Sequence, residues 1–263
     1  MLGIALSGGG ALGIAHIGVL KALEEYNVRP DIISGCSAGA IAGALYCSGK
    51  RSGDLLEFVK KAYTYKMLQL RFPTKGWVSL GYLRKMLIDA LERDRFEDLE
   101  IPLLVAAVNL NTGKLEIFKD GSLVDTVVAS SSVPMMFQPV KIGDYQYVDG
   151  GMLNNFPVEP LIGMADKIIG VNVIPNIEVP NKSISNLVGI GMRCFELSLE
   201  ANTMHGRSHC DILIEPKKLH DYRMFQVYKY EEIAQIGYDA TMEQMDEILK
   251  VVNSKTPQKI PHS

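Results

Sequence analysis

The sequence predicts an α/β protein built on a mostly parallel sheet that helices cover on both faces. Short apolar runs alternate along the chain with longer segments of helical periodicity, an order typical of repeated strand–helix units. Glycine-rich turns mark two of the strand–helix junctions, at residues 7–13 and 35–39. Strands that are joined through helices run parallel, and the helices then pack on both faces of the sheet.

Apolar runs mark the strands of the first half, and apolar residues three and four apart mark its helices. The first helix ends before Asn27 and Pro30, and Gly49 closes the second, all residues that commonly end helices. The predicted elements are a strand at 2–6, a helix at 11–26, a strand at 31–34, helices at 38–48, 53–68 and 80–93, and a strand at 102–108.

Turn residues divide the second half. Asn111-Thr112-Gly113 predicts a hairpin that leads into a strand at 114–118. Gly143-Asp144 joins two short strands, the second of which ends at Asp149. The remaining predicted elements are helices at 122–130, 158–164 and 183–202, strands at 167–173 and 211–214, and a long amphipathic helix at 225–252.

Length and composition favour a single domain. The chain has 263 residues, of which 47% are hydrophobic and 22% charged, enough for a sizeable core. It contains neither an internal repeat nor a low-complexity linker, so we expect one domain over residues 1–252 and a loose tail over 253–263. The net charge of −3 gives no overall attraction to nucleic acid, and we expect no such partner.

Residues 1–20 are uncharged and mostly apolar, as signal peptides and membrane spans are. No basic segment precedes them, however, and Gly8-Gly9-Gly10 would weaken a membrane helix in its middle. A buried strand, a glycine turn and a buried helix explain them better. The four cysteines have no CxxC spacing, so we expect neither a zinc site nor disulfides, and a cytoplasmic protein.

Ser37 lies at the centre of Gly35-Cys36-Ser37-Ala38-Gly39, between a predicted strand and the small-residue run of the next helix. Strand, Gly-x-Ser-x-Gly and helix in this order form a nucleophile elbow, in which the glycines let strand and helix pass closely. The helix N-terminus also carries partial positive charge, which favours a developing oxyanion. Ser37 is therefore the candidate nucleophile.

A second glycine-rich turn follows the first strand and opens the first helix. It contains the Gly-x-Gly-x-x-Gly dinucleotide fingerprint, but that interpretation needs an acidic residue at the end of the second strand, and Asp31 lies at its start. Successive glycines can instead direct backbone amides at one point, as an anion site at a helix N-terminus. Because the ends of neighbouring parallel strands lie close together, Gly8-Gly9-Gly10 would face Ser37 as an oxyanion hole.

A serine nucleophile needs a proton acceptor, and the residues leave two interpretations open. The order Ser37, Asp149 and then His205, His209 or His220 would suit a Ser-His-Asp triad of the α/β-hydrolase type. That fold places its nucleophile after several strands, whereas here it follows only the second. Alternatively Asp149, which ends a strand before two glycines, projects from a sharp turn and is itself the base.

Three motifs in this order resemble those of the patatin-like phospholipases. They are Gly8-Gly9-Gly10-Ala11-Leu12-Gly13, Gly35-Cys36-Ser37-Ala38-Gly39 and Asp149-Gly150-Gly151. The segment at residues 129–134 is similar to the part of that family ahead of its Asp-Gly-Gly motif, and the resemblance spans about residues 3–175. The combination is far more specific than any one of the motifs.

The resemblance implies a three-layer α/β/α sandwich and a serine acyl hydrolase that cleaves carboxylic esters of lipids or phospholipids. It implies a dyad of Ser37 and Asp149, an acyl-enzyme intermediate and an oxyanion hole at Gly8-Gly9-Gly10, with no histidine, metal or cofactor. Many members have a basic residue in place of Leu12, and a residue other than Ser7 is commoner before the glycines. Leu12 leaves open how a phosphate head group would be oriented. A non-enzymatic lipid-binding or scaffold protein that keeps the elbow is the alternative from another class.

Residues 58–88 contain seven basic side chains among aromatic and large apolar residues, and no acidic residue. Such a segment suits peripheral contact with an anionic lipid surface or a lid over an acyl channel. An amphipathic helix with a solvated face explains it equally well. The sequence determines neither the physiological lipid, its acyl position and chain length, nor the oligomeric state.

Overall fold

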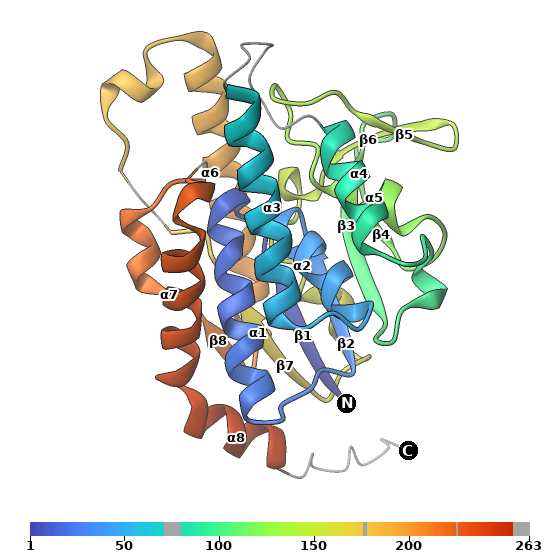
Figure 1. Ribbon diagram of the computed structural model, residues 1–263, viewed down its shortest axis with the longest axis vertical. Coiled ribbons are helices and arrows are strands. Elements are labelled where there is room, and N and C mark those ends of the chain that lie inside the picture. The colour runs from blue at the N-terminus through green and yellow to red at the C-terminus, as the bar shows by residue number, and fades with distance from the viewer. Residues whose placement is uncertain (71–79, 176–177, 225, 255–263) are drawn as a thin grey trace, which may run out of the picture.

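One mixed sheet runs through the computed structural model, which describes residues 1–70, 80–175, 178–224 and 226–254. In this part of the chain the sheet has eight strands in the order β5-β6-β3-β2-β1-β7-β8, and β4 pairs with β3 (Figure 1). The strands are β1 (Leu2–Leu6), β2 (Ile32–Cys36), β3 (Leu103–Asn109), β4 (Lys114–Phe118), β5 (Val140–Ile142), β6 (Tyr145–Asp149), β7 (Lys167–Val171) and β8 (Ile212–Ile214).

The centre of the sheet is parallel. Strands β3, β2, β1, β7 and β8 run in one direction, with Leu6 of β1 level with Gly35 of β2 and Val171 of β7. The strands β4 and β6 pair with opposite edges of β3 in antiparallel fashion, and β5 pairs antiparallel with β6. Central strands such as β1 and β2 are buried along their whole length, as expected where helices cover both faces. The predicted mostly parallel sheet is confirmed.

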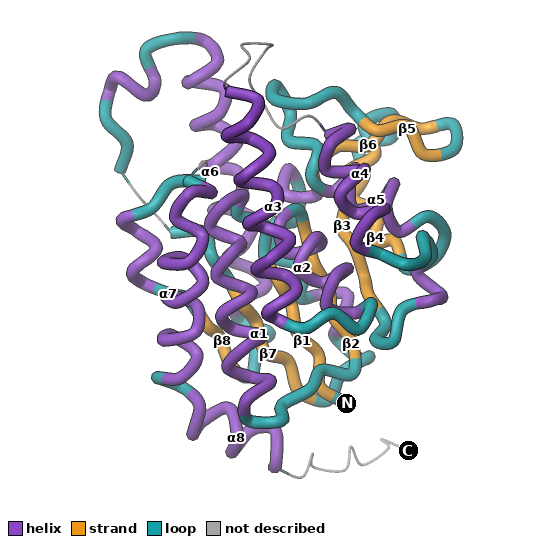
Figure 2. The backbone as a smooth tube through the Cα atoms, viewed as in Figure 1, coloured by secondary structure: helices purple, strands orange, loops and turns teal. Residues whose placement is uncertain are grey.

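Two layers cover the sheet, which gives the three-layer α/β/α arrangement. Figure 2 shows α1, α3 and α7 side by side on one face, and their apolar residues share one core with that face. On the other face Phe156, Val158 and Leu161 pack on Ala5 and Ile32. The helices are α1 (Ala15–Glu25), α2 (Ala38–Cys47), α3 (Ser52–Leu70), α4 (Leu80–Ala90), α5 (Leu123–Ser130), α6 (Leu187–Arg207), α7 (Tyr230–Met242) and α8 (Met245–Asn253).

Two predicted helices differ from the structure. The helix expected at 158–164 is only a 3-10 turn, Glu159–Leu161, because Ile162 is already extended with a ψ of 123° and Gly163 has a φ of 83°, outside the right-handed helical region. The long helix expected at 225–252 divides into α7 and α8, and Phe225 lies outside the described residues.

Packing explains the division of the long helix. A Cβ at Gly237 of α7 would lie 2.0 Å from the Ala15 carbonyl oxygen, so α7 rests directly on α1. After α7 the chain bends, and α8 buries Met245 and Ile248 in the core that covers this face of the sheet. The predicted tail begins at 253, and its residues from 255 onward lie outside the described part.

Among the described residues, no helix combines the length and the apolar character that a bilayer span requires.

Candidate active site

Ser37 occupies a strained turn between β2 and α2. Its φ of 52° and ψ of −120° are rare for a residue with a side chain and cost about 1–3 kcal/mol. Space is equally restricted beside it: a Cβ at Gly35 would lie 2.6 Å from the Gly39 carbonyl oxygen, and one at Gly39 would lie 2.2 Å from that of Leu6. Only glycine fits at either position, so Gly35 and Gly39 allow the elbow that the sequence predicts.

Ser130, at the end of α5, binds the backbone of the elbow at Ser37. Its Oγ accepts a hydrogen bond of 2.9 Å from the Ser37 amide and donates one of 2.7 Å to the Ala106 carbonyl oxygen. Ser130 therefore links the nucleophile turn to the neighbouring strand β3. The sequence placed Ser130 in a family-like segment but gave it no role. Its local signal is a serine in a run of three at a helix end, which does not identify the partner.

Asp149 is brought close to Ser37 by β6, which runs antiparallel to β3 and ends at Asp149. In β3, Ala106 pairs with Cys36 of β2, and the next residue, Ala107, pairs with Asp149 of β6 along the same edge, because β4 occupies the other edge. The last residue of β6 therefore meets the last residue of β2 end to end, directly before Ser37. Both side chains line one cavity, where Ser37 is 8% exposed and Asp149 is 1% exposed.

Burial governs the pKa of the Asp149 carboxyl. Loss of water disfavours the carboxylate and raises the pKa from 3.8 to about 6. The Ser37 hydroxyl, the Gly151 amide at 2.8 Å and the Cys36 thiol at 3.6 Å act in the opposite direction and stabilise the charge. A carboxyl of this kind is ionised at neutral pH and basic enough to take a proton. The two glycines that follow are packed closely, and a Cβ at Gly150 would lie 2.4 Å from the Ala106 carbonyl oxygen.

Cys36 is the neighbouring nucleophilic group, and its surroundings keep it protonated. The side chain is fully buried, and burial together with the nearby Asp149 charge raises the pKa of the Cys36 thiol well above its usual range. A thiol reacts as the thiolate, so this environment suppresses its reactivity.

The glycine turn lies against the same cavity. Gly9 and Gly10 line it with Ser37 and Asp149, and Gly10 has a φ of 56° that glycine adopts without strain. The Gly8 amide instead donates a hydrogen bond of 2.9 Å to the Asn155 carbonyl oxygen. Among the described residues, the Gly9 and Gly10 amides make no such backbone bond. These two amides are therefore the ones available to a ligand.

Apolar residues distant in sequence form the walls of this cavity, whose volume is about 270 Å³. Met192, Phe195 and Leu199 come from α6, and Val227 comes from the turn before α7. The sequence gave these residues no role, because a Met or Phe at helical spacing is indistinguishable from an ordinary core position. The cavity is largely apolar, with the catalytic candidates at one place in its wall.

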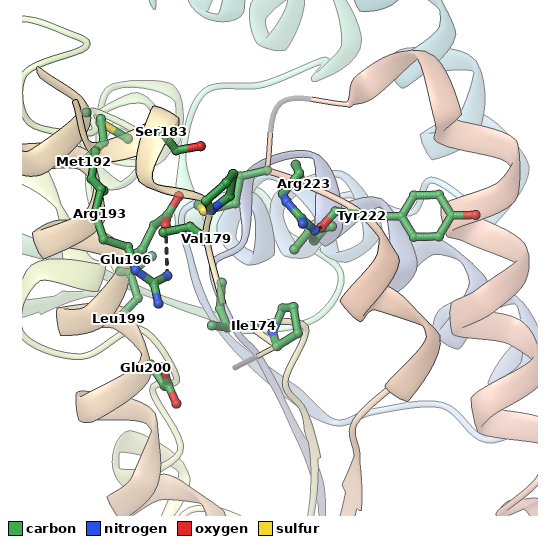
Figure 3. A pocket seen from close by; sticks show the side chains of 16 residues that line it. Ile174, Val179, Ser183, Met192, Arg193, Glu196, Leu199, Glu200, Tyr222 and Arg223 are labelled. Atoms are coloured by element: carbon green, nitrogen blue, oxygen red, sulfur yellow. Dashed lines mark hydrogen bonds and ion pairs between the residues drawn. The ribbon is translucent and has the colours of Figure 1, made fainter. Parts of the chain in front are cut away.

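A second cavity of about 370 Å³ adjoins the first, with Met192, Leu199 and Met224 lining both. Figure 3 shows Arg193 and Glu196 of α6 paired at one side of it and Arg223 approaching from the other. The paired nitrogen and oxygen are 3.2 Å apart. Leu12, where the resemblance favours a basic residue, lines this cavity as well. Two guanidinium groups therefore lie at the cavity that Leu12 faces.

The four histidines among the described residues lie outside the cavity of Ser37. His205 and His209 are exposed at the end of α6 and just after it, and their rings are 5.1 Å apart. His220 is exposed in a later turn, where its Nδ1 is 2.9 Å from the Lys217 carbonyl oxygen. His16 is buried, its Nε2 is 2.8 Å from the Ser7 carbonyl oxygen, and burial lowers its pKa to about 4. None of these four lines the cavity of Ser37 and Asp149 within the described structure.

The structure also shows where Asp31 lies and whether possible metal ligands come together. Asp31 accepts a hydrogen bond of 2.6 Å from the Leu2 amide at the start of the sheet, on the opposite edge from Ser37. The part of the chain that the structure describes contains no cluster of three or more His, Cys, Asp or Glu side chains arranged for a metal ion.

The predicted membrane segment at 58–88 can be followed only in part. Residues 71–79 and the side chains of 65–70 lie outside what the structure describes. Elsewhere Lys60 pairs with Glu57 at 3.2 Å and Arg84 contacts Asp125, while Leu80 and Leu83 line the cavity of Ser37. Peripheral membrane contact through this segment stays a prediction.

The sequence matches the family model of the patatin-like phospholipases over residues 4–162, more than half of the chain. The chain therefore belongs to the patatin-like phospholipase family. This agrees with the resemblance of its three motifs.

Two eukaryotic relatives and one mycobacterial relative support the assignment. The chain is 30% identical over 169 residues to Lysophospholipase NTE1 of Cryptococcus neoformans, covering 61% of this chain and 10% of that protein. It is 32% identical over 182 residues to Neuropathy target esterase sws of Drosophila melanogaster, covering 65% of this chain and 13% of that protein. An uncharacterized NTE family protein of Mycobacterium bovis is 34% identical over 178 residues, covering 63% of this chain and 29% of that protein. The chain thus matches less than a third of each relative's length.

Among solved structures, VipD from Legionella pneumophila is similar in fold. The TM-score is 0.52 at 17% sequence identity, with 94% of this chain and 66% of that chain covered.

Proposed function

We propose that the protein is a serine acyl hydrolase that cleaves carboxylic esters of lipids through a dyad of Ser37 and Asp149. One observation carries the proposal: a serine on a strained elbow shares an apolar cavity with a buried aspartate whose pKa is raised to about 6. The printed names of the relatives, a lysophospholipase and an esterase, agree with this chemistry.

The reaction proceeds in two halves. Asp149 accepts the Ser37 proton while the serine oxygen attacks the ester carbonyl, and the tetrahedral intermediate then expels the alcohol, which takes the proton from Asp149. In the second half Asp149 activates a water molecule that attacks the acyl-enzyme. The fatty acid leaves, and the proton returns to Ser37. Asp149 is held in place by the Gly151 amide and needs no further partner to act as a base.

The tetrahedral intermediate carries a negative charge that must be stabilised. Gly9 and Gly10 supply amides in the same cavity, while the Gly8 amide is already bonded to Asn155. We therefore assign the donors to Gly9 and Gly10, with Gly8 fixing the path of the loop. One such donor contributes roughly 3 kcal/mol to lowering the barrier.

Two alternatives have less support. A Ser-His-Asp triad would require His205, His209 or His220 beside Ser37, and the described structure places all three outside its cavity. A scaffold that keeps only the elbow would not require a buried carboxyl of raised pKa at the same place.

Incubation of the purified protein with a chromogenic acyl ester, and in parallel with a fluorophosphonate probe, tests the proposal. Turnover should be measurable, and peptide mapping should place the phosphonyl adduct on Ser37. If the protein hydrolyses no ester in a panel of chain lengths and does not bind the probe, the hydrolase proposal is wrong and the protein is a scaffold that keeps only the elbow.

The pH dependence follows from the base. Asp149 must be ionised to accept a proton, and because its pKa is raised to about 6, kcat/KM should fall as the pH drops below about 6. Initial rates on a neutral ester from about pH 4 to 8 measure the curve. The acid limb should persist when His205, His209 and His220 are all replaced with alanine. An acid limb with its midpoint near pH 4, the range of an exposed carboxyl, would contradict the role of burial.

Arg223 provides a test of head-group binding in the second cavity. Arg223→Gln should lower kcat/KM for a lysophospholipid by roughly fivefold, a modest factor because the side chain is exposed. A neutral ester with the same acyl chain is the internal control and should be unaffected. Equal losses on both substrates, or none on either, would show that phosphate does not bind there.

A further inference from the structure

A third cavity of about 180 Å³ extends from the catalytic one between α1, α2 and α3. Gly10, Ala11, Ala38 and Ile41 line both cavities, so the two adjoin directly beside the nucleophile. Every residue that lines the third cavity is glycine, alanine, valine, leucine, isoleucine or phenylalanine. We call it the side chamber.

The apolar lining of the side chamber suits a hydrocarbon. An enclosed apolar cavity of about 150 Å³ binds benzene, a molecule of six carbons. By the same scale the side chamber, at about 180 Å³, holds roughly seven carbons. A bound chain would contact the apolar walls of the chamber and remove them from solvent.

The position of the chamber fits one part of a lipid ester. Ala38 directly follows Ser37 and lines both cavities, so a chain attached to the carbonyl at Ser37 can pass Ala38 and Ile41 into the chamber. We propose that the side chamber binds the distal carbons of the substrate's acyl chain and sets the preferred chain length. This inference rests on the acyl-hydrolase function proposed above.

The far end of the side chamber is closed by three side chains. Leu45, Leu55 and Phe58 line the chamber and also a separate surface groove, and they therefore stand between the two. The groove has charged residues such as Lys50, Asp54 and Lys61 along it. Leu45 and Leu55 are buried, whereas Phe58 is partly exposed. A chain longer than the chamber would have to displace this wall into a polar surface.

Filling the chamber should shorten the preferred chain. Ala42 is 6% exposed on α2 and lines the side chamber but not the catalytic cavity. Ala42→Leu adds three carbons, and at about fourfold per methylene of lost burial, kcat/KM for a dodecanoyl ester should fall by roughly 50-fold relative to a butyryl ester. The butyryl ester, which needs only the catalytic cavity, reports intact chemistry.

Opening the far wall should act in the opposite direction. Phe58→Ala connects the chamber to the groove and should shift the optimum of the ester panel to longer chains. Gly53→Leu is the matched control, because it adds bulk to α3 at a position with nothing within 4 Å. It should leave the chain-length profile unchanged.

The outcomes separate this inference from the proposed function. If Ala42→Leu and Phe58→Ala hydrolyse esters with the wild-type chain-length profile, the side chamber does not bind the acyl chain, although the hydrolase function stands. If the wild type hydrolyses no ester, binding of free fatty acids of increasing length to wild type and Ala42→Leu still tests the chamber by calorimetry. Equal affinity of the wild type and Ala42→Leu for long-chain fatty acids would then overturn the proposal that the side chamber binds the acyl chain.

Discussion

Replacing Ser37 with alanine should abolish ester hydrolysis and labelling by a fluorophosphonate. Loss of the nucleophile in a serine hydrolase reduces turnover by roughly 10⁶-fold, because neither the base nor the oxyanion donors can form the acyl-enzyme alone. Only the Oγ atom is removed, and Ser37 makes its hydrogen bond to Ser130 through the amide, which alanine keeps. Circular dichroism should therefore match the wild type, and thermal unfolding should shift only slightly, through the lost contact of the hydroxyl with Asp149.

Cys36 provides the matched control for this experiment. It precedes Ser37 on the same turn, but its buried thiol has a raised pKa. Cys36→Ala should keep substantial activity, and iodoacetamide should not inactivate the wild type. An active Ser37→Ala variant together with inactivation by iodoacetamide would assign the nucleophile to the cysteine instead.

Replacing Asp149 with asparagine should lower turnover by 100-fold or more, the rough scale of general-base catalysis. The amide has the size of the carboxyl and can still accept the hydrogen bond that the Gly151 amide donates at 2.8 Å. It cannot take the Ser37 proton. The loss should fall on kcat for a soluble ester, with KM little changed, since the acyl chain contacts the apolar walls and not Asp149.

Stability distinguishes a missing base from a misfolded protein. The pKa of Asp149 is raised from 3.8 to about 6, so between these pH values the folded protein binds a proton that the unfolded chain has released. Stability from this group is therefore lost as the pH rises through that window, and at higher pH the buried charge costs up to about 3 kcal/mol. Asp149→Asn carries no charge and should unfold at a temperature equal to or above that of the wild type at about pH 8.

The histidine variants complete the comparison. Replacement of His205, His209 and His220 with alanine, singly or together, should keep most of the activity, because all three are exposed and outside the cavity of Ser37. A folded histidine variant as inactive as Asp149→Asn would return the protein to the triad hydrolases.

Much of the site's local geometry is already determined by the sequence. An apolar run, Gly35 and Gly39 around Ser37, and a run of small residues permit little besides a strand, a tight elbow and a helix, since a side chain at either glycine would meet the backbone. The same holds for the parallel centre of the sheet, because strands that alternate with helices have few other ways to bury both faces. The elbow and the parallel core both follow from patterns a few residues long.

Long-range pairing was decided only by the tertiary structure. The sequence placed Asp149 at the end of a strand but could not show that β6 runs antiparallel to β3, with Asp149 opposite Ala107. Strand direction depends on which partner offers the better surface and hydrogen bonds, and periodicity carries no information on that. The pairing of the Gly8 amide with Asn155, which leaves Gly9 and Gly10 available, has the same origin.

The walls of the cavities show the same limit. Met192, Phe195 and Leu199 are separated from Ser37 by more than 150 residues, yet they line its cavity. Apolar residues at helical spacing predict that a helix buries one face, but not what that face covers. The sequence thus determined the candidate reactive groups and the turns that present them, because these depend on neighbours in the chain. The tertiary structure alone decided which apolar surfaces close around them, because that depends on how the helices and the sheet pack together.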